Sequence, residues 1–128
     1  MKILGVGVDI IENKRIRKAI KNNAFKNRVF SKNELKQSHL SKNKGNYFSK
    51  RFAAKEALAK ALGTGIRNNL NFKDIEITNN KIGKPYYKKN NKIEEIVKKN
   101  FKVKNFNFFL SISDEKDYSI AFAIIQSI

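Results

Sequence analysis

Two acidic residues stand where an unpaired charge would be costly, and both could serve as metal ligands. Asp9 interrupts the apolar run of residues 6–11, and Glu56 lies among alanines in the segment 51–65 (RFAAKEALAKALGTG). Each has a simpler explanation, Asp9 as the N-cap of a following helix and Glu56 as half of a surface ion pair with Lys60. If the helix bearing Glu56 packs against the strand bearing Asp9, the two carboxylates could share one Mg²⁺. That ion prefers one or two carboxylates, several waters and the phosphates of a substrate.

Two short glycine-containing segments offer open backbone beside a lysine. They are Gly63-Thr64-Gly65, which follows Lys60, and Gly83-Lys84-Pro85. Glycine lets a phosphate or an adenine approach the main chain closely, and lysine supplies positive charge. Turns need glycine in any case, so each segment alone is a weak indication. Together with a shared Mg²⁺, the segments favour a site that neutralises a pyrophosphate during a phosphoryl-type transfer.

The composition excludes several other kinds of site. The chain has 128 residues, of which 41% are hydrophobic and 30% charged, and this is typical of one globular domain over residues 1–128. Because the chain has no cysteine, a disulfide framework, a thiolate zinc site and a cysteine nucleophile are all excluded. The single His39 excludes a multi-histidine metal site, and we expect its side chain to be solvated.

The net charge of +17 is a weak argument for nucleic-acid binding. Lysine, asparagine and isoleucine, which have AT-rich codons, are abundant, so genome composition could have supplied much of the charge. Arginine, which reads bases through two hydrogen bonds, is scarce. We therefore expect no nucleic-acid partner, and an acidic protein or a polyphosphate is an equally good partner on charge alone.

The elements that must position these residues follow from apolar periodicity and from helix and turn signals. Gly5, Gly7 and Asp9 share one face of an expected first strand, and Ser31 and Glu34 form a capping box. The order of elements predicts an α+β fold with a mostly antiparallel sheet and a long helix packed against it. We expect strands at 2–10, 74–78, 82–87, 106–113 and 118–126, and helices at 11–24, 31–39, 46–62 and 93–100.

No stretch of the chain has the roughly 20 consecutive apolar residues that a membrane span requires. The N-terminal apolar run is interrupted by Asp9 and followed by charged residues, so we interpret it as a strand rather than a signal peptide. We expect the protein to be cytoplasmic and to have no membrane partner.

Three segments together resemble the holo-[acyl-carrier-protein] synthase family of small 4′-phosphopantetheinyl transferases. The segment 7–16 (GVDIIENKRI) is similar to the first motif of that family, and the segment 51–65 is similar to the second. The third part consists of Gly83-Lys84-Pro85 followed by residues 110–113 (LSIS) and a closing strand. The order and spacing cover nearly the whole chain, and the long second motif is the most specific part.

The resemblance implies an enzyme that moves the 4′-phosphopantetheine arm of coenzyme A onto a serine of apo-acyl carrier protein and releases adenosine 3′,5′-bisphosphate. The reaction depends on Mg²⁺ and supports fatty acid biosynthesis. At the matching positions, Asp9 and Glu56 are metal ligands and, with Lys60, the catalytic residues. The residues implied for coenzyme A binding are Arg51, Lys60, Gly63, Gly83, Lys84 and Pro85.

The resemblance also implies partners. Arg15 and Lys18, on the first helix, would face the acidic carrier protein. Because larger members of the superfamily contain two similar halves with the site between them, this half-sized chain is expected to form a homotrimer with intersubunit active sites. Asp114 departs from the many members that have histidine there, so we do not carry over that residue's role in holding the 3′-phosphate.

Two alternatives remain open from the sequence. A non-enzymatic nucleic-acid binder predicts steep salt dependence of binding to any polyanion, and it gives no reason for Asp9 or for the alanines around Glu56. An inactive homologue would bind coenzyme A without transferring its arm, although no part of the metal motif is missing.

Overall fold

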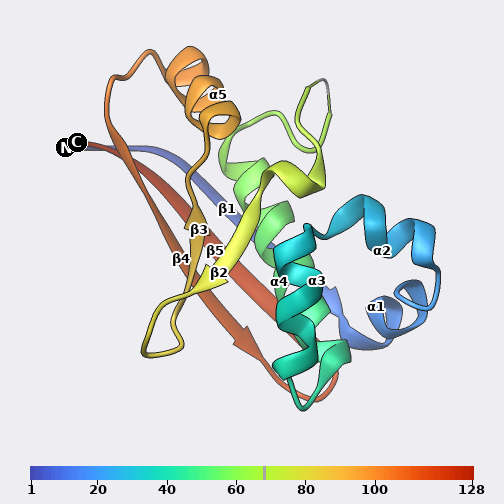
Figure 1. Cartoon of the computed structure of the whole chain (residues 1–128). Coiled ribbons are helices and arrows are strands. Elements are labelled where there is room, and N and C mark those ends of the chain that lie inside the picture. The colour runs from blue at the N-terminus through green and yellow to red at the C-terminus, as the bar shows by residue number, and fades with distance from the viewer. Residues whose placement is uncertain (68) are drawn as a thin grey trace.

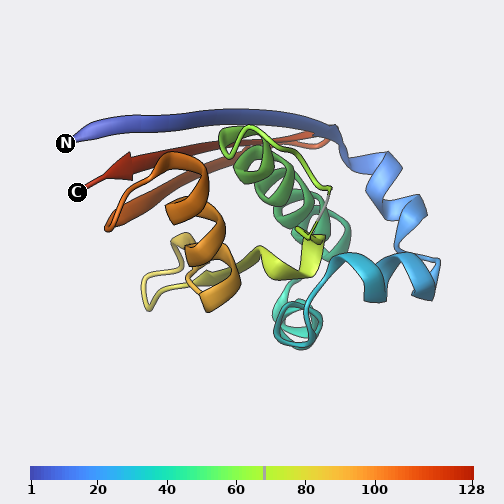
Figure 2. The ribbon, with the colours of Figure 1, turned by 90° about the horizontal axis from the view of Figure 1, so that it is seen from above.

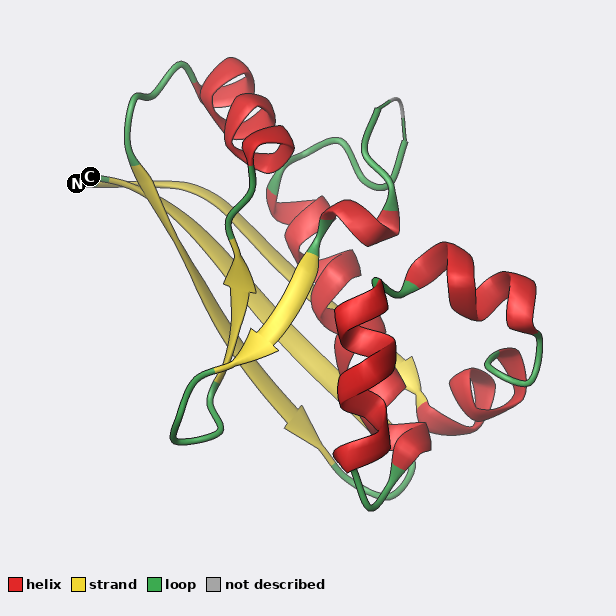
Figure 3. Ribbon diagram, viewed as in Figure 1, coloured by secondary structure: helices red, strands yellow, loops and turns green. Residues whose placement is uncertain are grey.

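The computed structural model describes residues 1–67 and 69–128 and combines two antiparallel sheets with helices that lie on one side of the larger sheet (Figure 1; Figure 3). The expected α+β class with a mostly antiparallel sheet is confirmed. The elements are β1 (Lys2–Glu12), α1 (Asn13–Ala19), α2 (Asn23–Val29), α3 (Lys32–Gln37), η1 (Ser38–Leu40), α4 (Lys44–Ala61), η2 (Phe72–Asp74), β2 (Glu76–Asn79), β3 (Pro85–Lys88), α5 (Asn91–Phe101), β4 (Phe106–Asp114) and β5 (Tyr118–Ser127).

The larger sheet has the order β1-β5-β4, with β5 antiparallel to both neighbours. Asp9 lies opposite Ala121 of β5, three residues before the end of β1. An irregularity in the β1–β5 register between Ile3 and Gly5 changes the face on which the first residues lie. Ile3 is therefore exposed and Leu4 packs against the core, whereas strict alternation had placed Ile3 with Gly5. The smaller sheet is the β2–β3 ribbon.

The long helix α4 lies directly on β1 because the contact positions have almost no side chain. A Cβ added at Gly5 would lie 2.0 Å from the carbonyl oxygen of Ala61, and one added at Gly7 would lie 1.9 Å from that of Ala57. The two backbones thus approach as closely as only glycine permits. Alanines on the facing side of α4 complete this contact, and the expected packing of a long helix on the sheet is confirmed.

The helices leave the other face of the larger sheet uncovered, as the view from above shows (Figure 2). Several large apolar side chains on this face are half exposed, and we call them the apolar face. They are Val6, Val8 and Ile10 of β1, Ile120 and Phe122 of β5, and Phe109 of β4.

The sequence-based prediction of one helix over 11–24 is wrong. β1 continues to Glu12, α1 ends at Ala19, and a second helix begins at Asn23. The reason is the side chain of Asn22, which accepts a hydrogen bond from the backbone N–H of Phe25 and so caps a new helix. The capping box of Ser31 and Glu34 at the start of α3 is confirmed.

Candidate active site

A charged cluster lies where α4 contacts β1, and it brings together residues that are about fifty positions apart in the chain. The Nζ of Lys60 donates to Oδ1 of Asp9 at 3.1 Å and to the carbonyl oxygen of Val8 at 3.0 Å. The side chain of Asp9 is 15% exposed, and that of Lys60 is 53% exposed. Asp9 does not cap α1, since Glu12 occupies the N-cap position. We call this cluster, with Glu56, the carboxylate half-site.

Glu56 lies one turn before Lys60 on α4, half-buried beside the same cluster. Burial raises the pKa of Glu56, and the negative charge of Asp9 raises it further, while the positive charges of Lys60 and Arg15 oppose the shift. The two carboxylates are therefore near enough to repel each other. Lys60 forms its ion pair with Asp9, on the neighbouring strand, rather than acting simply as a surface partner of Glu56.

The donor set at this edge fits a hard divalent cation. The charge of Asp9 raises the pKa of Glu56, and a shared positive charge would offset that repulsion. Within residues 1–67 and 69–128, no cluster of three or more His, Asp or Glu side chains lies where it could hold one ion. A cation held by Asp9 and Glu56 alone would therefore keep most of its coordination positions for water and phosphate oxygens.

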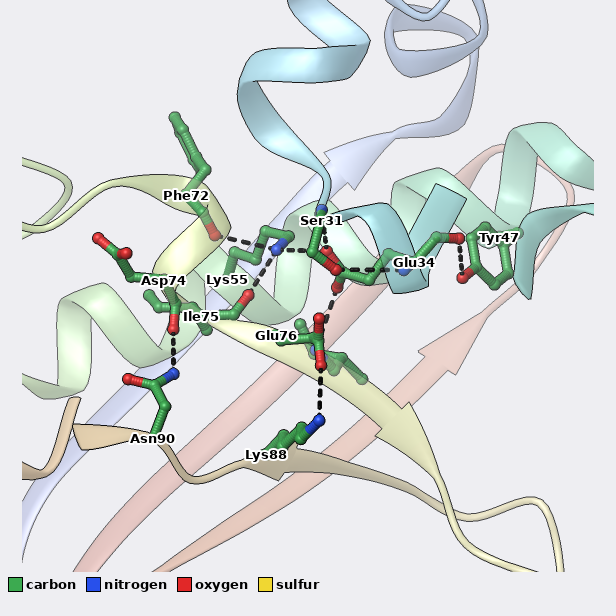
Figure 4. Close-up of polar contacts among 11 residues, drawn as sticks. Ser31, Glu34, Tyr47, Lys55, Phe72, Asp74, Ile75, Glu76, Lys88 and Asn90 are labelled. Atoms are coloured by element: carbon green, nitrogen blue, oxygen red, sulfur yellow. Dashed lines mark hydrogen bonds and ion pairs between the residues drawn. The ribbon is translucent and has the colours of Figure 1, made fainter. Parts of the chain in front are cut away.

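Lys55, next to Glu56 in sequence, is rotated from it by about 100° around α4. Its side chain is fully buried and points toward Glu34 (Figure 4). Its Nζ contacts Oε1 of Glu34 at 2.7 Å and donates to the carbonyl oxygens of Phe72 and Ile75. Glu34 in turn accepts from the backbone N–H groups of Ser31 and Ile77. Burial lowers the pKa of Lys55 and the charge of Glu34 opposes that shift. This pair ties α4 to α3 and β2, and it is not part of the carboxylate half-site.

A second cluster lies on the other flank of α4, around Arg51. The Cζ of Arg51 is 4.0 Å from the ring centroid of Tyr47, and its Nη2 donates to Oδ1 of Asn79 at 2.6 Å. Burial raises the pKa of Tyr47 to about 12, so its hydroxyl stays protonated and donates to the carbonyl oxygen of Glu34. Arg51 opens onto a hollow of about 140 Å³ lined by Lys50, Arg51, Asn79, Gly83, Pro85, Ile112 and Asp114. We call this cluster the arginine half-site.

The two half-sites face in different directions because of helix geometry. Lys60 follows Arg51 by nine positions on α4, which corresponds to a rotation of about 180° at 3.6 residues per turn. Glu56 is rotated from Arg51 by about 140°. Within one chain, the structure therefore brings together Asp9, Glu56 and Lys60, and separately Arg51, Gly83 and Pro85. That one coenzyme A touches both sets, across the contact between two subunits, stays a prediction.

The remaining predicted residues have distinct positions. Gly63 follows the end of α4 with φ +82°, and its backbone N–H donates to the carbonyl oxygen of Lys60. Lys84 is exposed in the β2–β3 turn, where its backbone N–H donates to Oδ1 of Asn80. Arg15 and Lys18 are exposed on α1, and Arg15 is near enough to Glu56 to affect its pKa.

Comparison with known proteins finds similarity over almost the whole chain. Residues 5–123 match the profile of the 4′-phosphopantetheinyl transferase superfamily (ACPS). The chain is 60% identical over 126 residues to a holo-[acyl-carrier-protein] synthase from Pelagibacter ubique, covering 98% of both chains. This chain belongs to the 4′-phosphopantetheinyl transferase superfamily.

Solved structures of the superfamily share the fold. The crystal structure of a holo-[acyl-carrier-protein] synthase from Neisseria meningitidis has a TM-score of 0.87 at 36% identity, with 98% of this chain and 99% of that chain covered. A holo-(acyl-carrier-protein) synthase from Bacillus anthracis, in complex with CoA (3′,5′-ADP), has a TM-score of 0.82 at 33% identity, and both chains are covered completely. In the described part of this phosphopantetheinyl transferase, no helix has the length and apolar character needed to cross a membrane.

Sequence reasoning missed three polar residues that connect the elements around the candidate site. Asn79 connects Arg51 to the β2–β3 turn, Lys55 ties α4 to α3 and β2, and Asn46 donates to Oδ2 of Asp114 at 3.1 Å. An asparagine before a glycine turn is a recognisable turn signal, but nothing in the sequence indicates its long-range partner. Asp114, which stands where many family members have histidine, thus accepts a hydrogen bond from α4.

Proposed function

We propose that this chain transfers the 4′-phosphopantetheine group of coenzyme A to a serine of apo-acyl carrier protein and releases adenosine 3′,5′-bisphosphate, in support of fatty acid biosynthesis. The main observation behind the proposal is the proximity of Asp9, Glu56 and Lys60 at one edge of the sheet. It is supported by similarity to holo-[acyl-carrier-protein] synthases along nearly the full chain. Because the nucleophile comes from the partner, no activated serine or cysteine is needed in this chain.

The proposed resident ion is Mg²⁺, held by Asp9 and Glu56. When bound, it supplies charge neutralisation at the pyrophosphate of coenzyme A and so makes the nucleotide a better leaving group. The two carboxylates orient the site, and Lys60 places a positive charge 3.1 Å from Asp9, on the side of α4 where the pyrophosphate would lie. There Lys60 stabilises negative charge that develops on the bridging oxygen.

The nucleotide end of coenzyme A is assigned to the arginine half-site and to the glycine segments. Arg51 is 6% exposed and its guanidinium lies over the Tyr47 ring, which supports the flat side of a planar cation. The turn at Gly83–Pro85 lines the same hollow and leaves its backbone open. Lys84 adds charge at this turn, and Gly63 leaves the end of α4 open beside Lys60.

We assign α1 as the docking surface for the acidic carrier protein, through Arg15 and Lys18. Both side chains are exposed, and Arg15 lies close to Glu56, so a carrier bound on α1 would present its serine next to the carboxylate half-site. The net charge of +17 favours association with an acidic partner at a rate that falls as salt increases.

A homotrimer with active sites between subunits accounts for two features of the single chain. The first is the apolar face of the larger sheet, with Val8 53% and Phe122 41% exposed. The second is the division of the predicted coenzyme A residues between opposite flanks of α4. In a cyclic trimer, each contact can place the carboxylate half-site of one subunit beside the arginine half-site of the next. Residues 1–128 would act as one domain per subunit, and the cytoplasmic location stays a prediction.

The deciding experiment is a mass measurement on the carrier. The purified protein is incubated with coenzyme A, Mg²⁺ and apo-acyl carrier protein, and the intact mass of the carrier is recorded. We expect a gain equal to one phosphopantetheine group on the carrier serine, and no gain when that serine is replaced by alanine. An unchanged carrier mass, with a chain that still binds coenzyme A, would indicate the inactive-homologue alternative instead.

A further inference from the structure

Asn79, the last residue of β2, joins two parts of the arginine half-site through one side-chain amide. Its Oδ1 accepts from Nη2 of Arg51 at 2.6 Å, and its Nδ2 donates to the carbonyl oxygen of Gly83 at 2.8 Å. Arg51 belongs to α4, whereas Gly83 belongs to the β2–β3 turn. The amide therefore uses both of its functions, an acceptor toward the helix and a donor toward the turn.

Arg51 needs such a partner to keep one orientation. The Tyr47 ring supports the flat side of the guanidinium, with Cζ 4.0 Å from the ring centroid, but stacking allows rotation in the plane of the ring. Among the described residues, the buried Nε of Arg51 has no hydrogen-bond partner. The bond from Nη2 to Asn79 thus sets the in-plane orientation of the group.

The turn has its own internal hydrogen bonds, and these do not connect it to α4. Oδ1 of Asn80 accepts from the backbone N–H groups of Ile82 and Lys84, and the N–H of Gly83 donates to the carbonyl oxygen of Asn80. Gly83 has φ +86°, which glycine adopts without strain. The turn can keep its shape without Asn79 but would lose this link to Arg51.

We propose that Asn79 is a positioning residue for coenzyme A, because it sets the separation between the Arg51 guanidinium and the Gly83–Pro85 turn. This inference rests on the proposed function, in which both groups bind the nucleotide end of coenzyme A. Asn79 is far from Asp9, Glu56 and Lys60 in the fold, on the opposite flank of α4. Its loss should therefore weaken nucleotide binding and leave the chemical step unchanged.

The test compares Asn79→Ala with the wild-type protein and with Asn91→Ala, which removes an exposed amide at the start of α5. For Asn79→Ala we expect KM for coenzyme A to rise about tenfold, as for a lost hydrogen bond to a charged group, with kcat within about twofold. The affinity for adenosine 3′,5′-bisphosphate, measured by calorimetry, should fall by the same factor. Asn91→Ala should change neither constant.

Asn79→Asp separates the two bonds of the amide. The carboxylate can still accept from Arg51 but cannot donate to the carbonyl oxygen of Gly83, so a positioning role predicts that KM stays raised. The inference is overturned if KM and nucleotide affinity in Asn79→Ala match the wild type, or if kcat falls while both stay unchanged. If the wild-type protein transfers nothing, the proposed function fails, and the calorimetric comparison still decides the role of Asn79.

Discussion

Glu56 shows how a proposed metal ligand can oppose folding. Its carboxylate is half-buried, and both burial and the charge of Asp9 raise its pKa. A carboxylate whose folded-state pKa lies above its unfolded-state value makes the folded state less stable once it ionises. A bound cation would reverse that penalty, so the two charges that repel each other in the free protein would favour binding of the proposed ion.

We predict that Glu56→Gln and Asp9→Asn each lower kcat/KM by at least about a hundredfold, because each removes a proposed metal ligand. Carrier mass gain over time gives the rate, and circular dichroism checks the fold. Lys88→Gln, at an exposed position on β3, serves as a control for the loss of a charged group and should keep full activity. Full activity in either ligand variant would contradict the metal assignment.

The raised pKa of Glu56 gives a pH dependence with a defined sign. Between the ordinary value of 4.5 and the raised value, the folded protein binds more protons at Glu56 than the unfolded chain does. In metal-free buffer, the unfolding free energy of the wild type should therefore rise relative to that of Glu56→Gln as pH falls toward 4.5. Urea titrations of both proteins across this range measure the difference, and a difference that is constant with pH would count against the shift.

Metal binding can be measured without turnover. With chelator, we expect the wild-type protein to stay folded and to lose transfer activity. Adding Mg²⁺ at a hundred times its dissociation constant should stabilise the fold by about 2.7 kcal/mol, since the ion binds only the folded state. Glu56→Gln should show no such rise in Tm, and an equal rise in both proteins would place the ion elsewhere.

At the scale of elements, the contact between β1 and α4 determines whether the carboxylate half-site exists. Two glycines and the facing alanines allow the two backbones to touch, and this places Asp9 beside Lys60. The small residues were visible in the sequence, and so were the long helix and the strand. The sequence did not show that this helix packs on this strand, because no local signal specifies which helix lies on which strand.

We predict that Gly7→Ala lowers Tm by roughly 10 °C, because the added methyl group meets the carbonyl oxygen of Ala57. The transfer rate should fall by a larger factor than the fraction of folded protein does. Thermal unfolding and the carrier mass assay measure the two effects. Gly65→Ala is the matched control for Tm, since it adds the same group with no atom within 4 Å and carries only the strain of φ +68°. Equal losses of Tm in the two variants would argue against a steric contact.

At the scale of the whole molecule, one side of the larger sheet is covered by helices and the other is not (Figure 2). The sequence predicted the strands. It did not show which phenylalanines of β4 lie in the core and which lie on an outer face. Phe106 is buried, whereas Phe109 is 48% exposed on the apolar face. Side chains alternate between the two faces of the sheet along each strand. Only the position of the helices determines which of these faces is buried.

We predict a sedimentation mass near three times the 14.8 kDa of one chain. Phe122→Asp should yield smaller species without activity, because a charge at the centre of an apolar contact is costly. If sites lie between subunits, mixing the inactive variants Glu56→Gln and Arg51→Ala should restore activity, to roughly a quarter of the wild-type level with random assembly. A mixture that stays inactive, with exchange of subunits verified, would place each site within one chain.

The sequence alone determined the local features: the strand with its glycines and Asp9, the long helix with Glu56 and Lys60, the capping box and the closing hairpin. These depend on propensities and periodicities that act over a few residues. Only the tertiary structure decided that Lys60 reaches Asp9, that Lys55 points away to Glu34, and that Arg51 faces the opposite flank of α4 with Asn79. Such pairings depend on how far apart and at what angle distant segments pack, which no short stretch of sequence encodes.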